Sequence, residues 1–243
     1  MNEIIQSDAL IYLRSLPDNF IDLTLTDPPY GVGMARHGEI GGGGKAFIPS
    51  AWDDKRLGKE YLDEILRVSK NSIIFGGNYY ADMLPASRCW VVWFKKEGLP
   101  SNSFADAELA WTSFDQNTRV CSVRWNGWVK DLSEHEEMTA HPTQKPLELM
   151  RWILDKYSNR GDLILDPFCG SGTTCVAAKQ LGRNYIGVEI NPEYVAISRS
   201  RCNEAQVEEN IFDKMIRTLV DDLIHAELFP ETQEVHHDIH ITL

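Results

Sequence analysis

A carboxylate, two prolines and an aromatic ring follow one another in "LTDPPYGVG", residues 25–33. Proline has no backbone N–H, fixes its own φ and moves the residue before it out of the helical region. The preceding run "IDLTLT" alternates as a strand does. We therefore expect residues 27–30 to form a stiff, extended loop at the carboxyl end of that strand. Its carboxylate and its free carbonyls could accept hydrogen bonds.

A glycine turn between an apolar strand and a helix is the second candidate site. It lies in "DLILDPFCGSGTT", residues 162–174. Glycines let the backbone turn sharply and approach a ligand closely, and the helix start beyond them offers free N–H groups. The strand "YIGVEI" contains Glu189, 19 residues after Gly170. An acidic side chain at about this distance binds ribose hydroxyls in nucleotide-binding α/β folds, although such a turn can also be a plain connection.

Two common nucleotide ligands fit this turn poorly. A P-loop requires a lysine after its second glycine, and none follows Gly172. The dinucleotide pattern requires a third glycine where this chain has Cys175. A nucleoside-bearing cofactor without a pyrophosphate remains.

Strands and helices alternate along the chain, which favours a doubly wound, largely parallel α/β sheet. The expected strands are residues 3–6, 21–26, 71–76, 89–94, 107–112, 162–166 and 184–189. The expected helices are residues 9–16, 59–69, 78–84, 146–157, 172–182, 192–202 and a long one around 205–228.

Composition is that of a soluble globular protein, with 43% hydrophobic and 25% charged residues among 243. No apolar segment approaches the roughly 18 residues of a membrane span, and no secretion signal is visible at the N-terminus. Five cysteines without a Cys-x-x-Cys pair are typical of free thiols in a reducing cytoplasm. We therefore expect a cytoplasmic protein without a membrane partner.

The net charge of −12 is concentrated at the C-terminus, where residues 203–243 carry ten acidic and two basic side chains. The rest of the chain could still form a basic groove, although no long basic run indicates one. Charge therefore neither supports nor excludes a nucleic-acid partner.

Taken together, the two motifs resemble those of the DNA amino-methyltransferases. The catalytic motif of that family reads Asp/Asn/Ser-Pro-Pro-Tyr/Phe, and its cofactor motif is similar to "DPFCGSGTT". Here the catalytic motif comes first, which resembles the permuted order called the β class. The N-terminal block "IIQSDALIYLRSLPDNFIDLTLTDPPYG" and "HPTQKP" at 141–146 are further matches, so the resemblance covers about residues 2–202. It implies a Rossmann-like, seven-stranded, mostly parallel sheet of the class I S-adenosylmethionine-dependent methyltransferases.

The resemblance also implies a reaction: transfer of a methyl group from S-adenosylmethionine to the exocyclic N6 amine of adenine in double-stranded DNA. Asp27 and the Pro28 carbonyl would accept the two N–H bonds of the amine, and the stiff prolines, Pro28 and Pro29, would hold both acceptors in place. Tyr30 would stack on the base, which must be flipped out of the duplex. Asp at the first motif position leans toward adenine and Ser toward cytosine N4, so cytosine is the runner-up. Methylation of RNA or of a protein glutamine amide remains open, as does an inactive cofactor-binding homologue.

For the cofactor, the residue matching Asp8 contacts the adenine in this family, although Asp8 could also cap the helix after it. The segment at 141–146 would help to hold the methionine part, and Glu189 would bind the ribose. No metal site is expected. The expected cofactor-binding residues are Asp8, Ala9, Thr143, Lys145, Asp166, Phe168, Cys169, Gly170, Ser171, Gly172, Thr173, Glu189 and Ile190.

We expect a catalytic domain over residues 1–202 and an acidic C-terminal helix and tail over residues 203–243. Within the first, residues 31–50 hold seven of the 17 glycines and are expected to form a mobile loop. Residues 113–140 are the candidate target-recognition segment. A homodimer is plausible because β-class relatives commonly pair, whereas nothing in the chain indicates a restriction endonuclease partner.

Four further residues allow more than one interpretation. Trp125 and Trp128 could contact DNA or could equally be core aromatics. Lys95 and Lys96 are expected at a solvated strand end, where they would meet phosphates only if the site lay nearby.

Overall fold

The computed structural model describes residues 1–32, 55–98, 105–126, 129–130, 144–208 and 219–220. The chain divides into two compact units, Met1–Val207 and Glu208–Leu243. The elements below all belong to the first unit.

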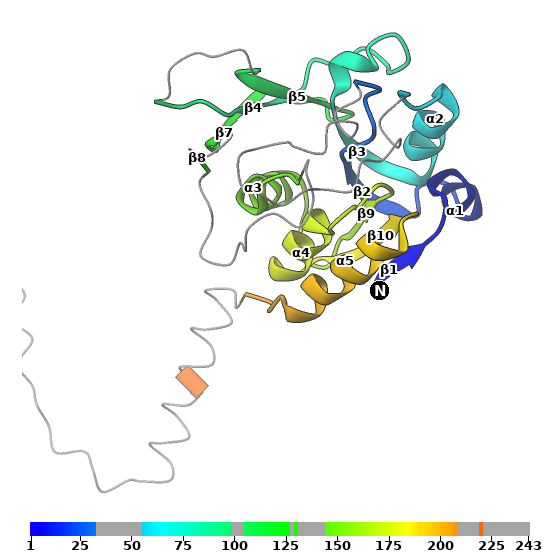
Figure 1. Cartoon of the computed structure of the whole chain (residues 1–243), viewed down its shortest axis with the longest axis vertical. Helices are drawn as coiled ribbons and strands as arrows, with labels where there is room; N and C mark the ends of the chain where they lie inside the picture. Colours follow the sequence, from blue (N-terminus) through cyan, green and yellow to red (C-terminus); the bar gives the residue numbers. More distant parts are fainter. Residues whose placement is uncertain (33–54, 99–104, 127–128, 131–143, 209–218, 221–243) are drawn as a thin grey trace, which may run out of the picture. The chain divides into compact units, whose positions relative to one another are not determined.

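An eight-stranded sheet runs through this unit in the order β1-β10-β9-β2-β3-β5-β4-β6 (Figure 1). Every neighbouring pair is parallel except the two pairs that β5 makes with β3 and β4. Parallel strands end at the same edge of a sheet, and the antiparallel β5 begins there. The strands are β1 (Asn2–Gln6), β2 (Ile21–Thr26), β3 (Ser69–Phe75), β4 (Trp90–Phe94), β5 (Ala107–Thr112), β6 (Arg119–Ser122), β9 (Leu163–Asp166) and β10 (Asn184–Glu189).

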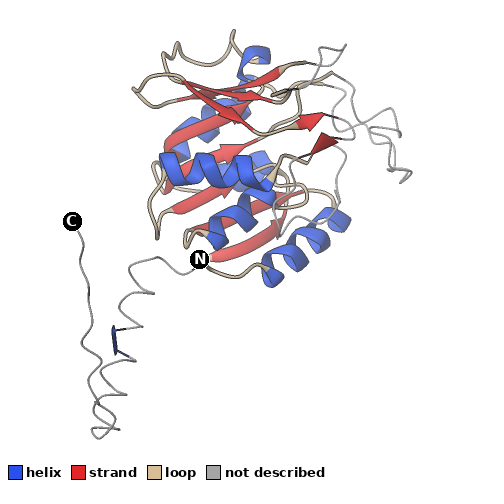
Figure 2. Ribbon diagram, turned by 90° about the vertical axis from the view of Figure 1, so that its left-hand side faces the viewer, coloured by secondary structure: helices blue, strands red, loops and turns tan. Residues whose placement is uncertain are grey.

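Helices cover both faces of the sheet (Figure 2). One hydrophobic core lies against α1 and α2, and the other against α3, α4 and α5. This arrangement confirms the expected doubly wound α/β class. The helices are α1 (Ala9–Ser15), α2 (Lys59–Val68), α3 (Leu147–Tyr157), α4 (Thr173–Gln180) and α5 (Pro192–Glu204), with a short 3-10 turn, η2 (Gly77–Tyr79). No helix among the described residues is long and apolar enough to cross a membrane.

Capping side chains define the starts of two helices at the edge of the sheet where the parallel strands end. The Ile11 amide donates to Asp8 Oδ1 at 3.0 Å, so Asp8 caps α1. The Glu193 amide donates to Asn191 Oδ1 at 2.9 Å, and Pro192 occupies the first turn of α5.

The structure corrects three expectations about individual elements. The sheet has eight strands and not seven, because Arg119–Ser122 adds β6 beside β4 with a single buried side chain, too weak a pattern to predict. Residues 78–84 do not form a regular helix: only Gly77–Tyr79 is a 3-10 turn, between a left-handed Gly76 and the proline at 85. The expected helix from 205 does not begin there, because α5 ends at Glu204 and residues 205–208 are not helical.

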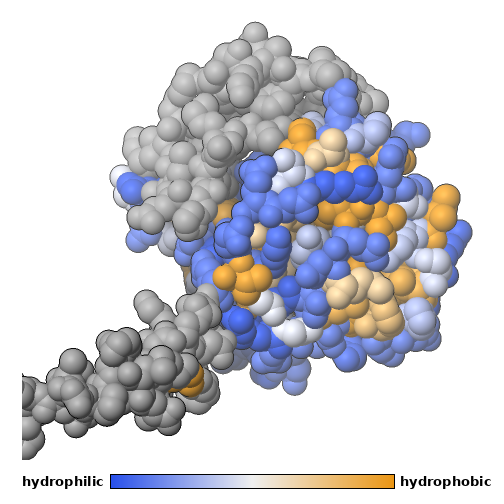
Figure 3. All heavy atoms as spheres, turned by 90° about the horizontal axis from the view of Figure 1, so that it is seen from below, coloured by the Kyte–Doolittle hydropathy of each residue, from blue (hydrophilic) through white to orange (hydrophobic). Residues whose placement is uncertain are grey.

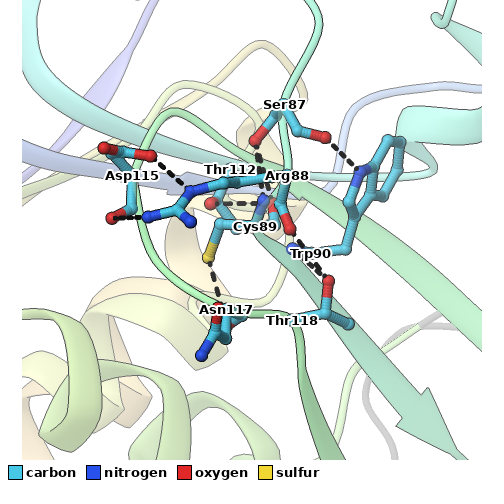
Figure 4. Close-up of polar contacts among 8 residues, drawn as sticks. All are labelled: Ser87, Arg88, Cys89, Trp90, Thr112, Asp115, Asn117 and Thr118. Carbon is cyan, nitrogen blue, oxygen red and sulfur yellow. Dashed lines mark hydrogen bonds and ion pairs between the residues drawn. The ribbon is translucent and has the colours of Figure 1, made fainter.

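A cluster of polar contacts holds the connection between β5 and β6 against the start of β4 (Figure 4). Thr112 Oγ1 donates to the Cys89 carbonyl at 3.0 Å, and Thr118 Oγ1 donates to the Arg88 carbonyl at 3.1 Å. Arg88 also pairs with Asp115. These contacts lie at the amino end of β4, away from the edge where the parallel strands end. Their role is therefore structural.

A core substitution tests the packing of α2. Ile65 is fully buried among side chains of α1, β2 and β3. Ile65→Ala is expected to lower the free energy of unfolding by about 2–5 kcal/mol, because it removes buried methyl groups and leaves a cavity. Urea unfolding followed by circular dichroism measures the change.

Ile11→Ala is the matched control. Apolar residues also reach the surface between bands of polar ones (Figure 3), and Ile11 is 70% exposed. Its truncation should change stability by no more than about 0.5 kcal/mol. Equal losses at the two positions would contradict the packing described.

Candidate functional site

Four carboxylates lie at the edge of the sheet where parallel strands end. Asp8 follows β1, Asp27 follows β2, and Asp166 and Glu189 are the last residues of β9 and β10. A cavity of about 410 Å³ lies among them, and both sequence motifs contribute to its wall, the first through Asp27 and the second through residues 166–171. Two loops that are far apart in the sequence therefore face one cavity.

The turn after β9 has a backbone conformation that favours glycine. Gly170 and Gly172 have φ of 49° and 83°. A Cβ at position 172 would lie 2.7 Å from the Cβ of Ser198 in α5, so a side chain there would collide with the helix. The Gly172 amide donates to the Cys169 carbonyl at 2.7 Å and closes the turn directly before α4.

Glu189 is held by backbone amides at the end of β10. Its Oε2 accepts from the Gly170 amide at 3.0 Å and its Oε1 accepts from the Asn191 amide at 2.7 Å. Burial raises the pKa of its carboxyl, and these amides oppose the shift. Because an ionised carboxylate has about four acceptor positions, Glu189 can still accept from hydroxyls of a ligand in the cavity.

Asp166 is buried and has no cation among its contacts in the described chain. Thr26 Oγ1 donates to Asp166 Oδ1 at 2.7 Å and the Phe168 amide donates to the same oxygen at 3.2 Å. Burial raises the pKa of Asp166 to about 6, because the hydrogen bonds offset only part of the desolvation of its charge.

Two tyrosines hold the loop after β2. The Tyr30 hydroxyl donates to Asp27 Oδ1, and the Tyr80 hydroxyl donates to the Pro29 carbonyl. The Tyr30 ring stacks on Tyr79 with centroids 5.0 Å apart. The sequence predicted free carbonyls in this loop, but the Pro29 carbonyl already accepts a hydrogen bond. No described residue donates to the Pro28 carbonyl.

A lysine bridges two carboxylates beside this loop. Lys145 Nζ donates to Asp27 Oδ2 and lies 3.3 Å from Glu108 Oε2. Glu108 is the second residue of β5 and also pairs with Lys95 through Oε1 at 2.8 Å. The described side chains thus form a chain of alternating charge from Asp27 to Lys95.

The pKa values of these groups follow from their mutual contacts. Burial raises the pKa of Asp27, and the nearby Lys145 opposes the shift. Burial would lower the pKa of Lys145, but Asp27 and Glu108 more than compensate and raise it. Burial would raise the pKa of Glu108, but Lys145 and Lys95 lower it. Lys145 is therefore a cation at neutral pH.

Most of the expected site residues line the cavity. Of the four expected catalytic residues, Asp27 and Pro29 contribute to its wall, while Pro28 and Tyr30 do not. Gly172 shapes the turn without lining the cavity, and Thr143 lies outside the described residues. The expected cofactor residues in the wall are Asp8, Ala9, Lys145, Asp166, Phe168, Cys169, Gly170, Ser171, Thr173, Glu189 and Ile190.

Other expectations fall partly outside the described residues. Most of the glycine-rich segment 31–50 lies outside them, as do residues 131–140 of the candidate recognition segment and Trp128. Trp125 is described and packs, partly buried, against one of the two cores. All five cysteines are buried and free.

The sequence analysis misjudged the burial of Lys95 and Lys96 and missed two residues that hold the site, Glu108 and Tyr80. Lys96 is buried and pairs with Asp106 at 2.6 Å, and Lys95 is half-buried, so the expected solvated strand end was wrong. The sequence did not predict that Glu108 and Tyr80 lie beside the Asp27 loop. A carboxylate inside the otherwise apolar "AELAWT" was the one local signal for Glu108.

The chain is similar in sequence to known DNA methyltransferases. A family model described as DNA methylase, of the N6/N4 methyltransferases, matches residues 89–200. The type II methyltransferase M.HinfI of Haemophilus influenzae is 28% identical over 86% of this chain and 70% of its own length. The type II methyltransferase M1.MboII of Moraxella bovis is 25% identical over 85% of this chain and 98% of its own.

Solved structures of methyltransferases share the fold of this chain. The crystal structure of an M1.HpyAVI–SAM complex has 26% identity and a TM-score of 0.52, covering 84% of this chain and 100% of that one. The cytosine-N4-specific PvuII DNA methyltransferase has 17% identity and a TM-score of 0.56, covering 93% of each chain, and supports the fold alone.

The raised pKa of Asp166 predicts a pH dependence of stability. Its pKa is about 6 in the folded protein and near the ordinary 3.8 when unfolded. The folded state therefore binds the proton more tightly, and stability must fall as pH rises from about 4 to about 6. Relative to Asp166→Asn, which keeps an oxygen acceptor, the wild type should lose about 3 kcal/mol over this range and then stay level.

Urea unfolding at a series of pH values measures the difference between the two proteins. Asp155→Asn, at an exposed position of α3, is the control and should follow the wild-type profile. Parallel profiles for the wild type and Asp166→Asn would contradict the assignment.

Proposed function

We propose that this chain is a DNA amino-methyltransferase of the N6/N4 type and that it methylates the N6 amine of adenine in double-stranded DNA. The cosubstrate of the family is S-adenosylmethionine, and DNA is its substrate. One observation carries the proposal: Asp27 and the glycine turn at Gly170 line the same cavity. An amine acceptor and a cofactor turn must face each other for direct transfer.

The residues around the cavity fit a nucleoside-bearing methyl donor. Glu189 offers acceptor positions to ribose hydroxyls, and the turn is so tight that a Cβ at Gly172 would strike α5. Asp8 and the exposed Ile190 also line the cavity and would contact the base of the donor. When bound, S-adenosylmethionine supplies an electrophilic methyl group on a sulfonium.

Asp27 and Pro28 would prepare the amine. The lone pair of an exocyclic amine is delocalised into its ring, so the nitrogen is a poor nucleophile. If Asp27 accepts one N–H and the Pro28 carbonyl accepts the other, the nitrogen moves toward tetrahedral geometry and its lone pair becomes available. Such positioning can recover about 7–11 kcal/mol of a barrier. The new N–C bond uses this lone pair, and the C–S bonding pair stays on sulfur.

Asp27 would also deal with the charge that the transfer creates. The nitrogen becomes positive when it gains the methyl group, and a carboxylate beside it stabilises that charge. Burial raises the pKa of Asp27, so it is a better proton acceptor than a solvated aspartate. The amine proton can leave through Asp27, and no cysteine has to act as a nucleophile.

A base inside a duplex cannot reach this cavity, so the target must be flipped out at a cost of a few kcal/mol. Tyr30 is the proposed stacking partner. Tyr79 already covers one face of its ring at 5.0 Å, so the base would use the other face or displace Tyr79. The Asp at position 27 favours adenine over cytosine within the family motif.

Nucleoside analysis tests the choice of base. Plasmid DNA from a methylation-deficient host, incubated with the protein and methyl donor, should yield N6-methyladenine after enzymatic digestion and mass spectrometry. N4-methylcytosine without N6-methyladenine would overturn the choice of base. Methylation of RNA but not of duplex DNA would overturn the choice of substrate.

Asp27→Ala tests the role of the carboxylate. Turnover should fall by about 10²–10⁴-fold, because the acceptor of the amine is removed. Affinity for S-adenosylhomocysteine, measured by calorimetry, should change by no more than about threefold, since Glu189 and the glycine turn are untouched. Asp115→Ala, in the connection between β5 and β6 and outside the cavity wall, is the matched control and should keep wild-type turnover. A fully active Asp27→Ala protein is incompatible with this mechanism.

A further inference from the structure

The buried ammonium of Lys145 is shared between two carboxylates. It donates to Asp27 Oδ2 and lies 3.3 Å from Glu108 Oε2. The rings of Tyr30 and Phe75 lie within 5.8 Å and 5.3 Å of its Nζ. Only 8% of the residue is exposed, so water cannot screen this charge.

One carboxylate oxygen of Glu108 is paired with a lysine, and the other can still accept a hydrogen bond. Its Oε1 pairs with Lys95 at 2.8 Å. Its Oε2 is buried and makes no hydrogen bond among the described residues, although Lys145 lies close by. A buried carboxylate oxygen without a donor is unfavourable, so Oε2 is ready to accept a hydrogen bond from the lysine.

Both carboxylate oxygens of Asp27, in contrast, already accept hydrogen bonds. In this structure Tyr30 donates to its Oδ1 and Lys145 to its Oδ2. In the proposed reaction Asp27 must accept an amine N–H and stabilise a positive charge on that nitrogen. A lysine cation in direct contact with Asp27 opposes both, because like charges repel strongly where water is excluded.

We propose that Glu108 is a positioning residue that takes the hydrogen bond of Lys145 when Asp27 engages the substrate amine. The ammonium moves from Asp27 Oδ2 to Glu108 Oε2 and keeps all its protons. The Lys145–Glu108 pair is then neutral, and the negative charge of Asp27 is available to the amine. Lys95 keeps Glu108 aimed at the lysine. This inference rests on the proposed function, and Glu108 itself touches neither substrate nor cofactor.

A double-mutant cycle tests it. Glu108→Gln keeps the side-chain shape but removes the charge, so Lys145 stays on Asp27 and kcat should fall at least about tenfold, with KM for DNA within about threefold. Lys145→Met leaves Asp27 without its cation and Glu108 with Lys95 alone, and it should also be slow. The double variant Glu108→Gln with Lys145→Met restores the charge balance, and its kcat should exceed that of each single variant.

Two further measurements separate this role from a structural one. Affinity for S-adenosylhomocysteine, measured by calorimetry, should stay within about threefold of wild type in Glu108→Gln. Asp106→Asn is the matched control: it makes the same change two residues earlier, in the exposed partner of Lys96, and should leave kcat unchanged. Glu108→Asp keeps the charge and should be faster than Glu108→Gln.

The outcomes are distinct. Wild-type kcat in Glu108→Gln, or a double variant no faster than the single variants, overturns the role of Glu108. If Glu108→Gln does not fold, the double variant must still be faster than Lys145→Met, and failure to do so overturns the role as well. A wild-type protein that methylates cytosine changes only the target base, and the same ranking still tests Glu108. A wild-type protein that methylates no DNA overturns the proposed function and this inference with it.

Discussion

A carboxylate buried at the end of a strand must find donors or a cation, and this constraint shapes the catalytic side of the cavity. Asp27 meets it with the Tyr30 hydroxyl and the Lys145 ammonium. The lysine is itself buried and lies between two carboxylates, Asp27 and Glu108. Lys95 in turn balances Glu108. The alternating charges are thus a consequence of placing one carboxylate where water is scarce.

The cofactor side of the cavity meets the same constraint in another way. Glu189 is satisfied by two backbone amides, and Asp166 by a threonine hydroxyl and an amide. Neither has a lysine or arginine contact among the described residues. Neutral donors satisfy a carboxylate without cancelling its charge, so burial raises the pKa of both groups. The two sides therefore differ: lysine ammonium groups balance the carboxylates around Asp27, whereas neutral amide and hydroxyl donors satisfy Glu189 and Asp166.

The order of strands brings the two sides together. β9 lies beside β2 in the centre of the sheet, and the hydrogen bond from Thr26 to Asp166 links the two motif-bearing strands across 140 residues of sequence. The central strands are covered on both faces by hydrophobic cores, which hold their ends rigid. Precise placement of an acceptor loop opposite a glycine turn depends on that rigidity.

The sequence by itself determined the features that depend on neighbouring residues. Alternating strands, the cap at Asp8, the Asp-Pro-Pro-Tyr loop and the glycine turn are local, because φ restrictions and side-chain periodicity act over a few residues. These features were sufficient to indicate the α/β class and a resemblance to the methyltransferases, and the expected doubly wound sheet was confirmed.

Only the tertiary structure decided which charges meet. Lys95 and Lys96 appeared to be a solvated strand end, yet they pair with Glu108 and Asp106. Glu108 reached the site because β5 runs antiparallel to its neighbours and so begins at the edge where they end. The partners Asp27 and Lys145 are 118 residues apart. No local pattern encodes such a contact, since the energy of a buried ion pair depends on distance and burial in space and not on position along the chain.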